Sequence, residues 1–168
     1  MDLRTAEKLA NDIKKNISFK LPTPITIITV GSIRRKKSII KDIDLLVVLP
    51  KRYLNKYDTI LKSAIIKKNV VDIACGKRRR SFIINKNCQV DLFITTTKEK
   101  PFALFHHTGS NKYNIRVRAH AKAQGYLLNQ YGIFNRKTKK RINCNIKTEK
   151  DIAKFLNITY RPPEQRIF

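Results

Sequence analysis

The sequence predicts an α/β (α+β) protein in which a mixed β-sheet with helices is followed by a smaller, mainly helical region. In the first part of the chain, short runs rich in Val and Ile alternate with longer amphipathic segments, a pattern typical of strands between helices. Polar clusters that contain Gly or Pro separate these runs. After a polar connector that ends at Pro101, the β-rich runs give way to apolar residues at helical spacing.

The first part begins with a helix. Asp2 can cap it, and Leu3, Ala6 and Leu9 start an apolar series at helical spacing, which Pro22 breaks. β-rich runs bounded by turn residues predict the strands, and the segments between them predict two further helices. We therefore expect helices over 2–17, 33–39 and 52–63, and strands over 25–30, 42–49, 64–74, 81–85 and 89–94.

The second part is mainly helical. A long helical pattern stops at Gly125, a residue that favours the left-handed conformation of a helix C-terminus. Thr148 and Asp151 fit a capping box at the start of a last helix. These signals predict helices over 102–108, 111–124 and 149–156 and a hairpin-like stretch over 133–142. The shift in composition near residue 97 divides the chain into 1–97 and 98–168.

The composition limits the class of protein. With 168 residues, 42% of them hydrophobic, the chain can form one domain or two small ones around a real core. No run approaches the ~20 apolar residues of a membrane span, and the N-terminus lacks the apolar stretch of a signal peptide. Cys75, Cys88 and Cys144 are widely spaced, without a Cys-x-x-Cys pair. We expect a soluble intracellular protein with reduced thiols and neither a zinc site nor a disulfide framework.

The net charge points to a polyanionic partner. Lys and Arg number 37 against 12 Asp and Glu, which gives +25. Solubility does not need so large an excess, and nucleic acid is the usual partner of such a surface. A solvated cationic surface and an anionic membrane are the alternatives. Because the basic residues are spread along the whole chain, we expect the folded surface itself, and not a tail, to carry the footprint.

Asp42 and Asp44 form an Asp-x-Asp pair on a predicted strand. Side chains alternate along a strand, so both acids point to one face, with Cα atoms roughly 7 Å apart. Two carboxylates at that spacing can share two divalent ions held about 3.5–4 Å apart. Upstream, Gly31-Ser32 enters the predicted short helix, where free N–H groups and the positive dipole end suit phosphate. This order of elements favours a nucleotide-transfer site over a surface strand with two acids.

A two-metal site usually needs a third acid, and the sequence offers two candidates. Asp72 and Asp91 each lie within an apolar, strand-like run. An acid in such a run is unfavourable for strand propensity and costly when it is buried without a partner. Either acid could instead alternate to the solvent face, a reading that is stronger for Asp72.

A series of motifs runs in order over most of the chain. Gly31-Ser32, Asp42-x-Asp44 and Val90-Asp91-Leu92-Phe93 are followed by a stretch from Thr108-Gly109-Ser110 through Asn114, Arg116-Val117-Arg118 and Gly125-Tyr126 to Asn129-Gln130-Tyr131-Gly132. The ordered set resembles the motifs of the family X DNA polymerases, in which the last stretch belongs to the thumb. In size the chain is similar to minimal viral members that keep only two subdomains. The resemblance implies a nucleotidyltransferase palm over 1–97 and a thumb over 98–168.

The resemblance assigns roles to individual residues. It implies a metal-binding and catalytic triad of Asp42, Asp44 and Asp91, in which Asp91 helps to remove the proton from the primer 3′-hydroxyl. Two Mg²⁺ ions, for which Mn²⁺ can substitute, are the implied cofactors. The residues implied in nucleotide binding are Gly31, Ser32, Arg35, His106, Thr108, Gly109 and Asn114, and those implied in contacts with DNA and the nascent base pair are Arg116 and Arg118.

The implied activity is templated filling of short gaps in DNA, with gapped or nicked DNA, a dNTP and a DNA ligase as partners of a monomeric enzyme in base-excision repair. A viral origin, with work at replication sites in the host cytoplasm and presence in the virion, follows only from the resemblance. We expect no proofreading and, with only about 24 residues before the first strand, no lyase activity. The alternatives are a template-independent nucleotidyltransferase and a catalytically inactive basic DNA-binding protein.

One departure from the family concerns the position before the Thr-Gly turn. Larger relatives often carry aromatic residues there, whereas this chain carries His106 and His107. The histidine pair could stack on the nucleotide or hydrogen-bond the triphosphate, or it could be a solvated pair without a role.

Overall fold

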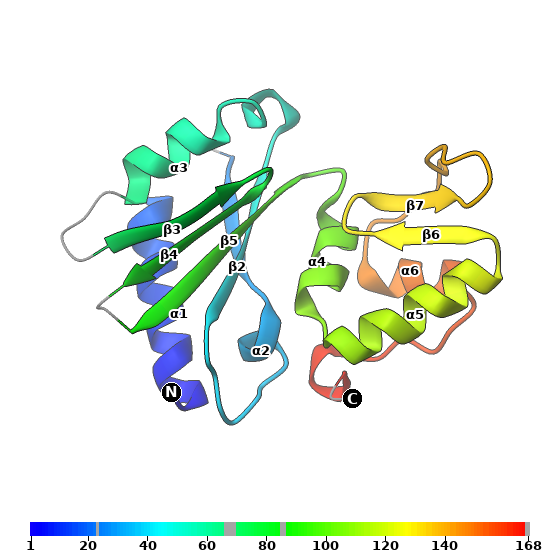
Figure 1. Ribbon diagram of the computed structural model, residues 1–168, viewed down its shortest axis with the longest axis horizontal. Helices are drawn as coiled ribbons and strands as arrows, with labels where there is room; N and C mark the ends of the chain where they lie inside the picture. Colours follow the sequence, from blue (N-terminus) through cyan, green and yellow to red (C-terminus); the bar gives the residue numbers. More distant parts are fainter. Residues whose placement is uncertain (23, 66–69, 85–86, 167–168) are drawn as a thin grey trace.

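A computed structural model of the chain describes residues 1–22, 24–65, 70–84 and 87–166. Its centre is a five-stranded mixed sheet in the order β1-β2-β5-β4-β3, in which β2 and β5 are parallel and the other neighbours antiparallel (Figure 1). The strands are β1 (Thr26–Thr29), β2 (Ile43–Leu49), β3 (Val70–Gly76), β4 (Arg79–Ile84) and β5 (Cys88–Thr96). The predicted mixed-sheet fold is confirmed.

Helices cover both faces of this sheet, and a second group of elements follows it (Figure 1). The helices of the first part are α1 (Leu3–Ser18), α2 (Gly31–Arg34) and α3 (Tyr57–Ile65). The second part contains α4 (Lys100–Thr108), α5 (Asn111–Ala123), the hairpin β6 (Tyr126–Asn129) and β7 (Gly132–Asn135), and α6 (Glu149–Phe155). Asp2 caps α1, and Thr148 and Asp151 form a capping box on α6, as the sequence predicted.

The alternation of side chains along β2 lets the sheet pack against helices on both of its faces. In β2, Leu45 and Val47 point into the core that α1 and α3 cover. Leu46 and Val48 point the other way and pack with Ala103 of α4. Because β2 is buried on both faces, its sequence is a nearly continuous apolar run. Side chains of β2 that lie an even number of residues from Leu46 therefore face the second part of the chain.

Two predicted elements of the first part have different bounds in the structure. The helix predicted over 33–39 is a single turn at Gly31–Arg34, because Lys36 adopts a left-handed conformation with φ of 56° and stops it. The strand predicted over 64–74 begins only at Val70. Its first residues belong to α3, since Leu61, Ala64 and Ile65 are buried at helical spacing; residues 66–69 of that prediction lie outside the described residues.

The other bounds differ from prediction by smaller amounts. The helix expected over 52–63 is a 3-10 turn at Lys51–Tyr53 followed by α3. The hairpin-like stretch expected over 133–142 is present, because Phe134 forms an antiparallel bridge with Arg141 and the N–H of Ile142 donates to the carbonyl of Ile133. The sequence did not predict β6, which pairs with β7 after Gly125. The last residue of the strand predicted over 81–85 falls outside the described residues. Within the described ranges, no helix has the length and apolar character needed to span a membrane.

Candidate active site

Three carboxylates meet on the face of the sheet that looks toward the second part. Asp44 of β2 lies directly opposite Asp91 of β5 in the parallel register, and Asp42 precedes β2 by one residue. One ligand oxygen from each of the three lies within 4.8 Å of the other two. The spacing of an Asp-x-Asp pair and the register of the neighbouring strand thus produce the arrangement that the sequence predicted for Asp42, Asp44 and Asp91.

Burial and like charges disfavour ionisation within the acid cluster. Burial, reinforced by the charges of Asp42 and Asp91, raises the pKa of Asp44 to about 7. The guanidinium groups of Arg35 and Arg79 act in the opposite direction but do not outweigh it. Oxygen donors that repel one another in this way suit hard divalent cations such as Mg²⁺ and Mn²⁺. The residues present therefore fit the predicted metal site.

Gly31 lies against the acid cluster, at a position that has no room for a side chain. Its φ is +62°, and a Cβ built there would lie 1.9 Å from Oδ2 of Asp44. The neighbouring backbone is fixed as well, because the N–H of Val30 donates to the carbonyl of Asp44 at 2.9 Å. The Gly-Ser turn is therefore packed directly onto the carboxylates.

Ser32 and Arg35 present unused hydrogen-bonding groups beside the acids. The hydroxyl of Ser32 and the Nε of Arg35 are buried and make no hydrogen bond. Arg35 donates through Nη1 to the carbonyl of Thr108, at the end of α4. Buried donors without partners are rare in folded proteins and indicate a group that binds there. Since α2 is only one turn long, its dipole is small, and these two side chains are the more prominent polar features of the turn.

The Thr108-Gly109-Ser110 turn joins α4 to α5 next to Arg35. Gly109 has φ of +71°, the Gly109–Ser110 peptide bond is cis, and a Cβ at Gly109 would lie 3.0 Å from Nη1 of Arg35. Ser110 caps α5 by accepting from the N–H of Tyr113 at 3.3 Å. The turn thus lies close to the guanidinium that the sequence predicted for the nucleotide site.

Asn114 and Arg118 of α5 face the same region, because they are one helical turn apart. Asn114 donates to the carbonyl of His106 at 2.7 Å, and its Oδ1 is buried without a partner. Arg118 contacts Nδ1 of His106. His107 stacks on Phe93 of β5, with ring centroids 3.9 Å apart. The two histidines are thus packed and half-buried, and they are not a solvated pair.

The histidines are neutral at ordinary pH. Burial, with a smaller contribution from Arg118, lowers the pKa of His106 to about 4. Burial, with smaller contributions from neighbouring cationic groups, lowers the pKa of His107 to about 3. Neither ring supplies positive charge near pH 7.

One predicted residue, Arg116, and the alternative third acid, Asp72, lie away from the acid cluster. Arg116 points from the opposite side of α5 and lines a cavity of about 330 Å³ with Val117 and His120. Asp72, the rejected candidate for the third acid, pairs with Arg80 at 2.5 Å on the face that α3 covers.

Sequence reasoning missed the donors that surround Asp91. Ser81 and Arg79 of β4 and Gln89 of β5 all contact its carboxylate. The alternation of side chains along the predicted strand 81–85 was the available signal for Ser81. It could not place Ser81 opposite Asp91 without the pairing of that strand with β5.

A buried ion network beside the site was also missed. Glu149 of α6 pairs with Arg34 of α2 at 2.5 Å and with the fully buried Arg166 at 2.8 Å. Arg34 also contacts the hydroxyl of Thr108. The network thus ties the Gly-Ser turn to the second part of the chain.

A mixed sheet that carries an acid cluster of this kind beside a Gly-Ser turn defines a nucleotidyltransferase. A family model described as DNA polymerase beta thumb matches residues 103–167. Repair DNA polymerase X of African swine fever virus (isolate Pig/Kenya/KEN-50/1950) is 35% identical to the chain over 99% of each protein. The chain therefore belongs to the family X DNA polymerases, which are DNA-directed DNA polymerases, and the predicted resemblance is confirmed.

Solved structures agree at the level of the fold. A ternary P/T complex of Leishmania infantum polymerase beta superposes with a TM-score of 0.80 at 22% identity, covering 99% of this chain and 76% of that one. A ternary gap complex of the same polymerase gives a TM-score of 0.81 at 20% identity, covering 100% and 71%. The palm-and-thumb fold of the chain is thereby shown.

Proposed function

We propose that the chain fills short gaps in DNA by transferring a nucleotide from a dNTP to a primer 3′-hydroxyl. The observation that carries the proposal is the convergence of Asp42, Asp44 and Asp91 beside the unpartnered hydroxyl of Ser32 and the guanidinium of Arg35. The carboxylates would hold two Mg²⁺ ions, for which Mn²⁺ can substitute. When bound, such ions neutralise phosphate charge and lower the pKa of a coordinated hydroxyl.

The residues of the site have distinct roles in this reaction. The primer 3′-oxygen forms a bond to the α-phosphorus, the bond to the β-phosphate oxygen breaks, and pyrophosphate leaves. The carboxylate of Asp91 receives the proton of the 3′-hydroxyl. Ser32 and Arg35 donate to the triphosphate, and Gly31 keeps the backbone close to it. Positioning and charge neutralisation supply most of the rate enhancement in such phosphoryl transfers.

The second part of the chain would hold the base pair and the DNA. Thr108 and Gly109 lie where the sugar would sit, and Asn114 and His106 present polar groups to the nucleotide. Arg118 would contact the nascent pair, while Arg116, on the other side of α5, would reach the DNA backbone. With a net charge of +25, affinity for gapped or nicked DNA should fall with a log–log salt slope of about −0.9 per phosphate contact. A shallow slope would contradict this role of the charge.

The division into a palm over 1–97 and a thumb over 98–168 is part of the proposal. It is supported by two larger apolar cores among the described residues, one formed by the sheet with α1 and α3 and the other by α4, α5, the hairpin and α6. A smaller cluster, in which Leu46 and Val48 meet Ala103, joins the two parts. The absence of proofreading and lyase activity, base-excision repair as the pathway, a monomeric state and a DNA ligase partner remain predictions. A lyase assay that traps a Schiff base on an abasic 5′-phosphate would overturn one of them.

Template dependence tests the proposed function. One-nucleotide-gapped duplexes that differ only in the template base are incubated with Mg²⁺ and each dNTP separately. Incorporation that follows the template base supports the proposal. Addition that ignores the template would favour the template-independent nucleotidyltransferase, and DNA binding without addition would favour the inactive DNA-binding protein.

A further inference from the structure

Successive side chains of β4 point to opposite faces of the sheet. Arg79 and Ser81 lie on the face that carries the acid cluster, and both contact Asp91. Arg80, between them, lies on the face that α3 covers, where it pairs with two carboxylates. One short strand therefore connects the third acid of the cluster to the opposite side of the sheet.

Ser81 is the fixed hydrogen-bond donor to Asp91. The two residues lie directly opposite each other in the antiparallel register of β4 and β5, and both side chains are buried, with Ser81 3% and Asp91 4% exposed. The Ser81 hydroxyl donates to Oδ1 of Asp91. Arg79 donates to Oδ2 at 3.0 Å, but its side chain is 52% exposed, and Gln89 makes longer contacts of 3.3 and 3.4 Å. Only Ser81 combines burial, a short side chain and a place in the strand ladder.

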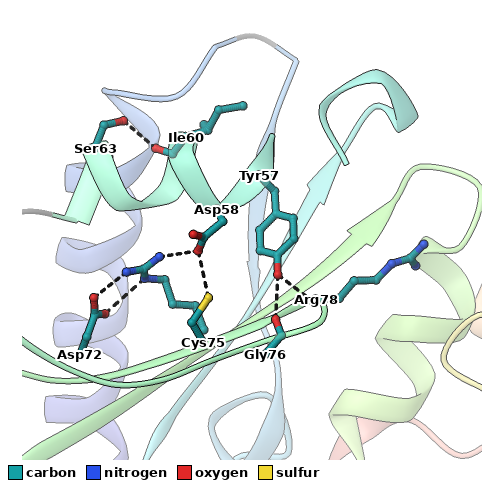
Figure 2. Close-up of polar contacts among 9 residues, drawn as sticks. Tyr57, Asp58, Ile60, Ser63, Asp72, Cys75, Gly76 and Arg78 are labelled. Carbon is teal, nitrogen blue, oxygen red and sulfur yellow. Dashed lines mark hydrogen bonds and ion pairs between the residues drawn. The ribbon is translucent and has the colours of Figure 1, made fainter. Parts of the chain in front are cut away.

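The other face of β4 is clamped by an ion cluster. The buried guanidinium of Arg80 donates to both carboxylate oxygens of Asp72 on β3, at 3.2 and 2.5 Å, and to Asp58 on α3 at 2.5 Å. Figure 2 shows the carboxylates of Asp58 and Asp72 converging from the helix and the strand, with Cys75 beside them. Three elements therefore meet on one side chain of β4.

The turn between β3 and β4 is fixed from the same helix. The hydroxyl of Tyr57 donates to the carbonyl of Gly76 at 2.7 Å and accepts from the N–H of Arg78 at 3.0 Å (Figure 2). Contacts from α3 therefore hold both the turn and the strand that follows it. The hydroxyl of Ser81 is thus presented to Asp91 by a braced strand.

We propose that Ser81 is a positioning residue that holds the Asp91 carboxylate in the orientation in which it joins Asp42 and Asp44. The inference rests on the proposed two-metal function of these acids. A carboxylate with one oxygen held by a rigid donor keeps its remaining lone pairs directed at the cluster, whereas a free one can rotate away. Hydrogen-bond partners of this kind set the affinity of metal ligands, and their removal costs about 10–100-fold in metal affinity or activity.

Two substitutions at Ser81 and one control test the proposal. Ser81→Ala removes the donor, and Ser81→Thr retains it in a residue that favours strands. Thr95→Val is the matched control, because Thr95 is a buried residue of β5 whose hydroxyl makes no hydrogen bond. Mn²⁺ binding to the free protein is followed by loss of the free-ion EPR signal, and the Mg²⁺ dependence of single-turnover gap filling is measured in parallel. Thermal unfolding of each variant reports the state of the fold.

We expect S81A to weaken Mn²⁺ binding and to raise the half-saturating Mg²⁺ concentration by about tenfold, with S81T and T95V close to wild type. Wild-type Mn²⁺ affinity and Mg²⁺ dependence in a folded S81A would overturn the role of Ser81. Equal losses in S81A and T95V would also overturn it, because they would indicate a general effect of altering the sheet. An Asp91→Asn variant that binds Mn²⁺ and extends DNA like wild type would instead refute the proposed function.

Discussion

The contact between Gly31 and Asp44 makes a sharp prediction for Gly31→Ala. A Cβ at this position would lie 1.9 Å from Oδ2 and 2.7 Å from Cγ of Asp44, whereas ordinary contact begins near 3.4 Å. The carboxylate would therefore have to retreat by about 1.5 Å, the difference between the ordinary contact distance and the 1.9 Å approach. A shift of that size removes Asp44 from the acid cluster.

The expected effects on stability and on activity can be separated. The left-handed conformation of Gly31, with φ of +62°, costs an alanine roughly 1–2 kcal/mol. A misplacement of about 1 Å at a catalytic site can cost on the order of 100-fold in rate. We therefore expect G31A to lose about 100-fold or more in single-turnover gap filling, and to lose more than the ~1–2 kcal/mol backbone cost in the free energy of unfolding, because the displacement of Asp44 adds to it.

Gly125→Ala is the matched control. Gly125 has φ of +83°, so an alanine there meets a similar backbone cost, but its Cβ would have no neighbour within 4 Å. Urea denaturation should show a loss of about 1–2 kcal/mol in G125A and a larger one in G31A, and rapid-quench kinetics should show a loss of activity in G31A alone. Near-normal activity in a folded G31A would refute the placement of Asp44 against the Gly-Ser turn.

Three further predictions concern the rest of the fold. Burial holds the pKa of His107 near 3, so as the pH falls below 6.5 the unfolded chain binds a proton before the folded chain does. The free energy of unfolding should therefore fall by up to about 1.4 kcal/mol per pH unit. H107F should reduce this slope in urea titrations. The hydrogen bond to Asp58 raises the pKa of the exposed Cys75 thiol, so iodoacetamide should alkylate this thiol slowly. D58N should accelerate the alkylation, and equal alkylation rates in D58N and the wild type would contradict this. Glu149→Ala leaves the buried Arg166 and the partly exposed Arg34 without their carboxylate and should cost about 3–5 kcal/mol in unfolding free energy. A loss below about 1 kcal/mol would count against the network.

The Asp42 and Asp44 pair could be predicted from the sequence because it depends on a local pattern: strand periodicity puts both acids on one face. Local pattern did not separate Asp91 from Asp72, since both lie in apolar, strand-like runs. The order of the motifs along the chain supplied the family, and the resemblance to it selected Asp91.

The parts that escaped prediction depend on contacts between distant residues. Ser81 becomes a partner of Asp91 only through the register of β4 on β5, and Glu149 meets Arg34 only when the second part of the chain packs on the first. The short α2 depends on the left-handed Lys36, a conformation that its residue type does not favour. Tertiary packing decided these features, and no local pattern records it.

The central claim is that Asp42, Asp44 and Asp91 hold the catalytic ions. Its most direct test compares Asp91→Asn with Asp72→Asn, because Asp72 lies in the same sheet but pairs with Arg80 on the other face. Each protein is given a one-nucleotide-gapped duplex, the matched dNTP and Mg²⁺. We predict extension by the wild type and by D72N, and none by D91N. Extension by D91N together with its loss in D72N would identify Asp72 as the third acid and contradict the account.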